Sequence, residues 1–339
     1  MEELGARERW MQGILALLLI LAVPLFLWLS WPVPLPFLVG GALAFLFMPA
    51  VNLLHQKGLS RWLATALLFL LLGGLVTLLA VLWLPTLGEE MEAFAQSIPP
   101  WFREIQTLSG RLPPAVADAA RESLPIWQAR VEGWVKARLE QADRLLESLF
   151  LLLLSPFVAF YMLADWPRFR QVLLRWVPTR QRTLFLRYVQ ELDRMLAGYI
   201  RGQFFLSILV GTLTALAMAL LGLPYWLLLG VAAAIGELIP YVGPFLGAVP
   251  ALWVAAGQSA GKLLWVAAVF LVIQQLEGAI MGPAIMRTTL GFHPLVVIFA
   301  LLLGGHFFGF LGVLLALPAL GFLVVTVRFL YRLFTQGWA

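Results

Sequence analysis

Three ionisable side chains lie within or beside long apolar segments of the chain: Glu237, Glu277 and His306. An ionised group in the hydrocarbon core of a membrane costs about 3 kcal/mol or more unless it is paired, hydrated or protonated, so such a group is a functional candidate. A buried carboxyl group can carry a proton, and Gln274 extends a polar stripe one helical turn before Glu277. The structural alternative is that Glu237 or Glu277 caps a broken helix or accepts hydrogen bonds from free backbone amides.

Glycine and proline interrupt two of the apolar segments, Gly236–Gly247 and Gly304–Gly312. Because an open backbone amide in hydrocarbon costs several kcal/mol, such breaks persist only where protein or a water-filled cavity satisfies the freed groups. We therefore predict that both segments line a pathway. For the glycines alone, close helix packing through small-xxx-small pairs such as Gly243 with Gly247 and Gly305 with Gly309 is the better explanation. Beside the ionisable groups, the candidate pathway residues are Pro240, Tyr241, Gly243, Pro244, Gly305, Gly309 and Gly312.

The composition is that of a polytopic membrane protein. Of 339 residues, 62% are hydrophobic and 12% are charged, whereas charged residues make up about 25% of a soluble domain. A membrane helix needs about 20 apolar residues, and the chain holds about eight hydrophobic segments. We therefore predict an all-α fold. The segments are residues 12–30, 34–54, 62–87, 145–163 and 203–222, and then an almost continuous run from 224 to 327.

Several classes of function are excluded by the residue content. The chain has no cysteine, and its histidines, His55, His293 and His306, show no metal-ligand spacing, so we expect no disulfide and no metal site. The arginines flank apolar segments, which reports membrane orientation and not nucleic-acid binding. Gly257–Gly261 matches a serine-nucleophile motif but joins two membrane segments in place of a strand and a helix. With no cofactor-binding motif present, we predict neither an enzyme nor a cofactor.

Basic residues near short loops indicate which side of the membrane each loop occupies, because lysine and arginine are retained in the cytoplasm. They lie before the first segment, between the second and third, and after the last: Arg7, Arg9, Lys57, Arg61, Arg328 and Arg332. Both termini are therefore expected to be cytoplasmic.

Five regions follow from the order of apolar and polar stretches. The polar stretches are an outer helical domain, which prolines at 99–100, 113–114 and 125 should cut into short helices, and a set of basic amphipathic helices along the anionic cytoplasmic leaflet. The regions are 1–87 with three spans, 88–147 as the outer domain, 148–164 as a fourth span, 165–201 as the basic helices, and 202–335 with the broken segments 224–256 and 293–318.

Shifting the sequence by 69 residues superimposes Gly236 on Gly305, Glu237 on His306 and Gly243 on Gly312. Interrupted segments at corresponding positions of two repeats point to the binding site of a secondary transporter. Two topologies remain open: each broken segment crosses the membrane once in a parallel repeat, or each folds back as a re-entrant hairpin in an inverted repeat. We favour hairpins, because the least helical residues would then form their tips.

At these residues the chain resembles the autoinducer-2 exporter family of PerM-like bacterial permeases. The resemblance covers nearly the whole length, and one departure is Ala279, where the family commonly has asparagine. It implies export of small molecules such as the furanosyl signal autoinducer-2, sodium or lithium exchange for protons in some members, and homo-oligomers, namely pentamers, as partners within the bilayer. The motifs that carry it are Gly236-Glu-Leu-Ile-Pro-Tyr-Val-Gly-Pro-Phe-Leu-Gly-Ala-Val-Pro250, Gln275-Leu-Glu-Gly278, Gly291-Phe-His-Pro-Leu295 and Gly304-Gly-His-Phe-Phe-Gly-Phe-Leu-Gly312.

Together, the residues and the resemblance predict a secondary transporter that exports a small polar solute under a proton or cation gradient. The alternatives are a Na⁺(Li⁺)/H⁺ antiporter and, from a different class, an oligomeric membrane scaffold that transports nothing.

Overall fold

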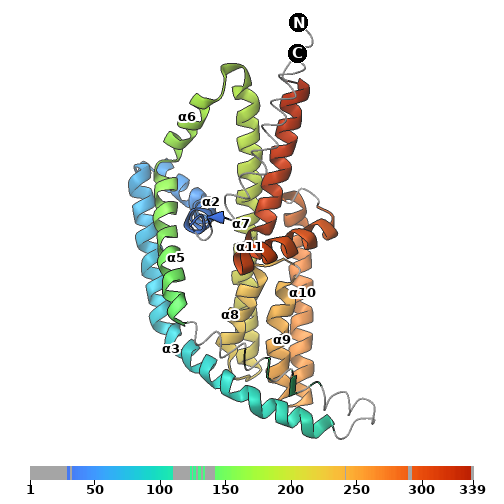
Figure 1. Ribbon diagram of the computed structural model, residues 1–339. Helices are drawn as coiled ribbons and strands as arrows, with labels where there is room; N and C mark the ends of the chain where they lie inside the picture. The colour runs from blue at the N-terminus through green and yellow to red at the C-terminus, as the bar shows by residue number, and fades with distance from the viewer. Residues whose placement is uncertain are drawn as a thin grey trace. The chain divides into compact units, whose positions relative to one another are not determined.

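The computed structural model describes residues 29–30, 33–109, a few positions between 123 and 133, 142–240, 242–288 and 292–336. Every regular element in that part of the chain is helical (Figure 1). The elements are α2 (Leu35–Gln56), α3 (Arg61–Ser109), α5 (Ala142–Ala164), α6 (Trp166–Trp176), a 3₁₀ turn η1 (Thr179–Gln181), α7 (Arg182–Leu220), α8 (Trp226–Glu237), α9 (Gly243–Ala256), α10 (Ala260–Thr288) and α11 (Pro294–Gln336).

Five of these helices, α2, α3, α7, α10 and α11, are long and apolar enough to cross a membrane. Three shorter apolar helices accompany them: Leu153–Ala164, Trp226–Glu237 and Gly243–Ala256. These helices cover the apolar stretches predicted from residue 34 onward, and the total of about eight segments stays a prediction. The first predicted segment, residues 12–30, falls almost entirely outside the described residues.

The chain forms two compact units. The first unit comprises residues 1–70, 151–202 and 281–339, and one of its apolar clusters joins α2, α3 and α5 through Ala44, Met48, Val51, Ala64 and Leu163.

Two arginines satisfy free backbone carbonyls inside this unit. Pro49 lies within α2 and has no N–H, which leaves the carbonyl of Phe45 without its helical donor. The Nε of Arg201 donates to that carbonyl at 3.0 Å. At the end of α5, the Nε of Arg61 donates to the carbonyl of Leu163 at 2.8 Å. The two arginines therefore complete the backbone hydrogen bonding of α2 and α5.

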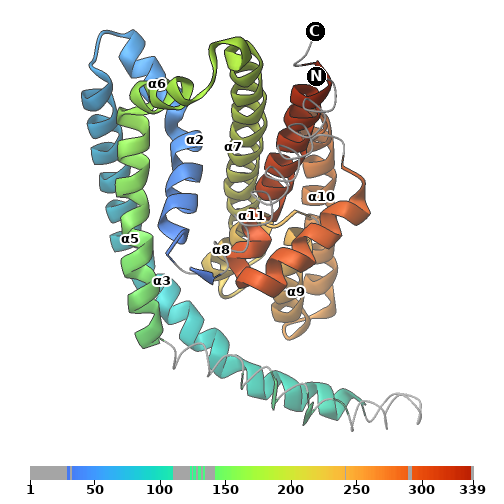
Figure 2. The same cartoon turned by 45° about the horizontal axis from the view of Figure 1, so that its top comes forward.

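The last helix of the first unit, α11, folds back on itself. Gly309 has φ +61° and ψ −146°. Essentially only glycine adopts this backbone conformation, because a Cβ atom would clash with the backbone. On either side of this bend Gly304 and Gly312 face each other so closely that a Cβ on either would collide with the other's backbone. Residues 294–308 and 310–336 therefore form two helical limbs that meet at a sharp bend and diverge from it (Figure 2).

The second limb of α11 is fixed to the first half of α7. The hydroxyl groups of Tyr188 and Thr326 lie 3.0 Å apart, and the rings of Tyr188 and Phe329 stack with centroids 4.6 Å apart. Glu191 pairs with Arg328 and Arg332 at 3.9 and 3.7 Å. α7 runs without a break from Arg182 to Leu220, and the region boundary expected at residue 201 stays a prediction.

The second unit comprises residues 71–150 and 203–280. Its apolar cluster draws residues from α7 to α10 and from the segment between α7 and α8: Met218, Leu223, Leu229, Ala251, Val254, Ala255 and Val266. Within this cluster α8 and α9 pack against each other as a short helical hairpin. At 1.5 Å per residue, α8 is about 18 Å long and α9 about 21 Å, which is less than the roughly 30 Å of a bilayer core.

The beginning of α8 is held by the second half of α3. Glu90 accepts a hydrogen bond from the N–H of Leu228 at 2.7 Å, in the first turn of α8, where carboxylates stabilise the free amides and the helix dipole. Phe94 packs edge-on against Tyr225 with ring centroids 5.6 Å apart. These contacts of α3 therefore stabilise the position of the α8–α9 hairpin at the start of α8.

One expectation about the outer region is wrong. Pro99 and Pro100 were expected to end a helix, but α3 continues through both to Ser109. Most of residues 110–141 lie outside the described residues, so the outer domain itself stays a prediction.

Replacing Gly312 by alanine should destabilise the bend of α11, because the new methyl group meets the carbonyl of Gly304 and backbone cannot rotate away as a side chain can. We expect a loss of about 1–3 kcal/mol, the usual cost of overpacking, seen as a lower melting temperature of the detergent-solubilised protein. Gly278→Ala is the matched control, since a Cβ at Gly278 meets no atom within 4 Å. Equal melting temperatures for the two variants would contradict the fold-back.

Candidate functional site

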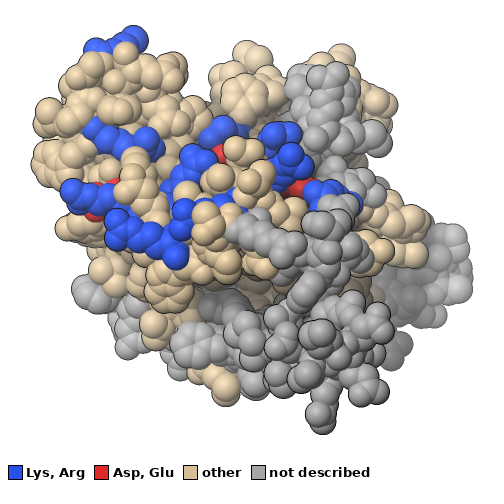
Figure 3. All heavy atoms as spheres, turned by 90° about the horizontal axis from the view of Figure 1, so that it is seen from above, with Lys and Arg blue, Asp and Glu red and all other residues tan. Residues whose placement is uncertain are grey.

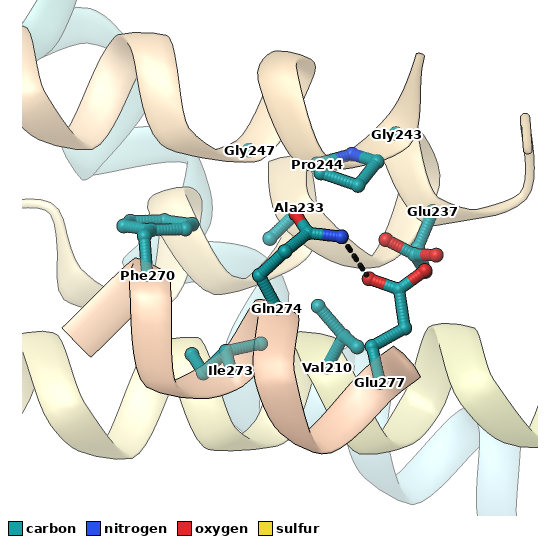
Figure 4. Close-up of a pocket in the computed structure, with 10 residues that line it drawn as sticks. All are labelled: Val210, Ala233, Glu237, Gly243, Pro244, Gly247, Phe270, Ile273, Gln274 and Glu277. Carbon is teal, nitrogen blue, oxygen red and sulfur yellow. Dashed lines mark hydrogen bonds between the residues drawn. The ribbon is translucent and has the colours of Figure 1, made fainter. Parts of the chain in front are cut away.

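A small cavity in the second unit lies between α7, the α8–α9 hairpin and α10 (Figure 4). Its volume is about 10 Å³, close to the minimum that holds one water molecule. Most of its lining is apolar, and the ionisable groups stand at one end. The lining residues are Val210, Ala233, Glu237, Gly243, Pro244, Gly247, Phe270, Ile273, Gln274 and Glu277.

Glu237 is the last residue of α8 and is only 2% exposed. Its Oε2 atom has no hydrogen-bond donor among the described residues. A buried acceptor without a donor costs about 1–3 kcal/mol, and more when it is charged. The carboxyl group is therefore poised to accept a proton or a cation.

Glu277 approaches the same place from α10. Its carboxyl group and that of Glu237 point toward each other, as Figure 4 shows. Gln274, one turn earlier, donates its side-chain N–H to Oε2 of Glu277 at 3.2 Å. Two like charges held face to face repel each other, so a proton or a cation shared between the two carboxyl groups would stabilise the arrangement.

The end of α8 is held by two buried polar side chains of α7. An α-helix leaves its last four carbonyls without intrahelical donors. Here the hydroxyl of Ser207 donates to the carbonyl of Ala234 at 2.6 Å, and the side-chain amide of Gln203 donates to the carbonyl of Glu237. The two carbonyls between them, of Ile235 and Gly236, accept from the backbone of the following turn.

Gln203 and Ser207 were not among the residues predicted from sequence. A signal for them exists, because they lie at i and i+4 in an otherwise apolar run and so share one helix face. Val210, which lines the cavity, continues that face.

The α8–α9 turn is closed by backbone contact. A Cβ on Gly243 would lie 2.6 Å from the Cα of Glu237 and 2.7 Å from the carbonyl oxygen of Gly236. One turn later, a Cβ on Gly247 would lie 2.9 Å from the Cβ of Ala233. Only glycine at these two positions lets α9 come close enough to hold Glu237 against α10.

The predicted site residues divide between the two units. Glu237, Gly243, Pro244, Gln274 and Glu277 line one cavity. Pro240 lies in the α8–α9 turn, and Tyr241 lies outside the described residues. The remaining four, Gly305, His306, Gly309 and Gly312, lie on α11 in the first unit, and their predicted share in a pathway stays a prediction.

No group of three or more His, Asp or Glu side chains within the described ranges is placed to hold a metal ion. The expectation that the chain has no metal site stays a prediction for the residues outside these ranges.

Comparison with known proteins gives one family and several relatives. Residues 15–332 match the model of the AI-2E family transporter. YueF of Bacillus subtilis, which carries the name of a transport protein, is 32% identical over 296 residues, 84% of this chain and 80% of its own length. PerM of Escherichia coli, named as a permease, is 31% identical over 294 residues, covering 84% and 83% of the two chains. YrrI of Bacillus subtilis, also named as a transport protein, is 28% identical over 309 residues.

Replacing Gln203 by alanine should destabilise the second unit, because the buried carbonyl of Glu237 then loses its donor. The expected loss is about 1–3 kcal/mol, measured as a lower melting temperature together with faster amide exchange at the end of α8. Gln275→Ala serves as the control, since Gln275 is exposed on α10. An unchanged exchange rate around Glu237 in the Gln203 variant would show that the bond does not support the turn.

Proposed function

Because the chain belongs to the AI-2E family of transporters, we propose that it is a secondary transporter that exports a small polar solute and couples this export to a proton or cation gradient. A role in membrane transport is common to the family and to the names of its relatives. The identity of the solute, the identity of the coupling ion and the direction of transport are what we propose beyond this shared role.

The observation that carries the coupling is the facing pair Glu237 and Glu277. One carboxyl group is buried, the other is half-buried, and a cavity the size of one water molecule lies beside them. Loading a proton or a cation between them removes the repulsion of two negative charges in an apolar surrounding. Loading and release would therefore change the energy of the α8–α9 hairpin against α10.

The membrane topology proposed is that of two re-entrant hairpins. Support comes from the length of α8 and α9, each shorter than a bilayer core, and from the fold-back of α11 at Gly309. Broken helices are tolerated at membrane depth where protein buries the freed backbone, and the carbonyls at the end of α8 are all satisfied. Both termini would be cytoplasmic, in a bacterial inner membrane.

The solute proposed, by family, is a small sugar-like molecule such as the furanosyl signal autoinducer-2. A cavity of about 10 Å³ is too small for it, since ligand sites for small molecules are usually about 300–1,000 Å³. The solute would bind only after the hairpin moves, and backbone groups at Pro240, Tyr241, Gly243 and Pro244 would then contact it. Gly305, His306, Gly309 and Gly312 are proposed as the corresponding contacts from α11. A homo-oligomer, a pentamer by family resemblance, is part of this proposal.

A Na⁺(Li⁺)/H⁺ antiporter is the second candidate, and the size of the cavity favours it. A bare cation fits where a sugar does not, and carboxylate and amide oxygens from Glu237, Glu277 and Gln274 are available as ligands. The third candidate, a scaffold that transports nothing, would function without uptake or release of a proton by Glu237 or Glu277.

In proteoliposomes with an imposed pH gradient, Glu237→Gln and Glu277→Gln should each reduce coupled flux by about tenfold or more, because an amide cannot take up and release a proton. Flux is read from a pH-sensitive dye inside the vesicles. Glu89→Gln is the control, since Glu89 is an exposed carboxylate of α3. Unchanged flux in the double variant would contradict a role of the two carboxyl groups in coupling, and would favour the scaffold without transport.

The same vesicles separate the two transport candidates. We expect labelled autoinducer-2 to cross in a saturable, gradient-dependent way, with little movement of Na⁺ reported by a sodium-selective dye. Na⁺ movement that saturates while autoinducer-2 stays excluded would instead assign the antiporter.

A further inference from the structure

α6 is a helix of two faces. Counting about 100° per residue around an α-helix, Phe169, Val172, Leu173 and Trp176 fall on one apolar arc. Arg168 and Arg175 border that arc on one side, and Arg170 borders it on the other. The helix buries no residue in the protein.

The apolar arc of α6 faces away from the rest of the protein. Phe169, Val172 and Leu173 are 55%, 50% and 51% exposed, and Trp176 is 85% exposed. The sequence predicted basic amphipathic helices over the whole of residues 165–201. In α7, however, the apolar side chains of this region are partly covered by another helix. Its aromatic residues Phe185 and Tyr188 pack on Phe329 of α11. The open apolar face therefore belongs to α6.

The location of α6 is fixed by the helix before it. α5 ends at Ala164 with an apolar segment, Leu153–Ala164, and α6 begins at Trp166 after the single linking residue Asp165. Arg168 pairs with Asp165 at 3.2 Å across this link, and α6 leaves the axis of α5 (Figures 1 and 2). A helix that turns aside where an apolar helix ends lies at the height of the membrane surface.

The distribution of positive charge indicates the kind of surface that this helix would bind. Lys and Arg side chains form a band across the view of Figure 3, with few acidic groups among them. A helix that is apolar on one side and bordered by arginines, with an exposed tryptophan, Trp176, at its end, matches the pattern of segments that lie in the plane of a bilayer interface.

We infer that α6 is a membrane-surface helix that inserts Phe169, Val172, Leu173 and Trp176 among the acyl chains of the cytoplasmic leaflet and binds anionic phospholipid headgroups through Arg168, Arg170 and Arg175. Lipid is favoured over a second copy of the chain, because arginines border both edges of the apolar face and their charges suit an anionic surface. Each arginine at such a surface strengthens binding about fivefold. This role is independent of Glu237 and Glu277.

The test uses the full chain, which contains no cysteine, so that one introduced cysteine carries one label. Phe169→Cys and Leu173→Cys place a spin label on the apolar face, and Gln171→Cys places it on the opposite, exposed face as the matched control. Each protein is reconstituted in nanodiscs that contain either a third phosphatidylglycerol or phosphatidylcholine alone. Collision rates are measured with oxygen, which concentrates in lipid, and with a water-soluble nickel chelate.

In anionic nanodiscs we expect the labels at 169 and 173 to collide several-fold more with oxygen than with the nickel chelate, and the label at 171 to show the reverse. Phosphatidylcholine, or Arg170→Gln with Arg175→Gln, should shrink this contrast severalfold. Three results would overturn the inference: equal water access on both faces, a contrast that ignores lipid charge, or apolar-face labels shielded from both agents, which is the mark of contact with protein such as a second copy.

Discussion

Backbone hydrogen bonding at the helix breaks is the constraint on which the structure depends. In the core of a bilayer no water is present to donate a hydrogen bond to a freed carbonyl. In this protein, side chains of other helices replace the missing donors. Arg201 serves the carbonyl that Pro49 leaves free in α2, and Arg61 serves the end of α5. Gln203 and Ser207 do the same for the end of α8. Helices can therefore stop or bend inside apolar surroundings with donors supplied to these freed carbonyls.

The α8–α9 hairpin and the bend of α11 are closed by the same device. In the second unit Gly236 and Gly243 bring backbone against backbone, and in the first unit Gly304 and Gly312 do so. In each case a side chain would hold the two limbs apart. The predicted repeat places Gly243 on Gly312 but Gly236 on Gly305, one residue beyond the Gly304 that makes the contact. At the α8–α9 turn the close limbs leave a cavity of only about 10 Å³ beside Glu237.

The closed turn explains why a carboxyl group can reside there at all. Glu237 is buried because the hairpin packs tightly against α7 and α10, and Glu277 faces it because α10 presents Gln274 and Glu277 on one side. Burial and mutual repulsion then make the state of the pair sensitive to a proton or a cation. The cavity beside them, of about 10 Å³, is far smaller than the roughly 300–1,000 Å³ of usual small-molecule sites.

The sequence alone determined the membrane class, the helical fold and the two glycine-broken segments, because apolar length and helix-breaking residues are local properties. It also placed Gln274 on the same face as Glu277, which follows from helical periodicity. It did not identify Gln203 and Ser207, since a donor for a distant carbonyl is chosen by how α7 packs on α8. It misjudged Pro99 and Pro100, through which α3 continues. That Glu237 and Glu277 face each other was decided only by tertiary packing, because a long-range contact between two helices is fixed by the shapes of all the side chains and glycines between them.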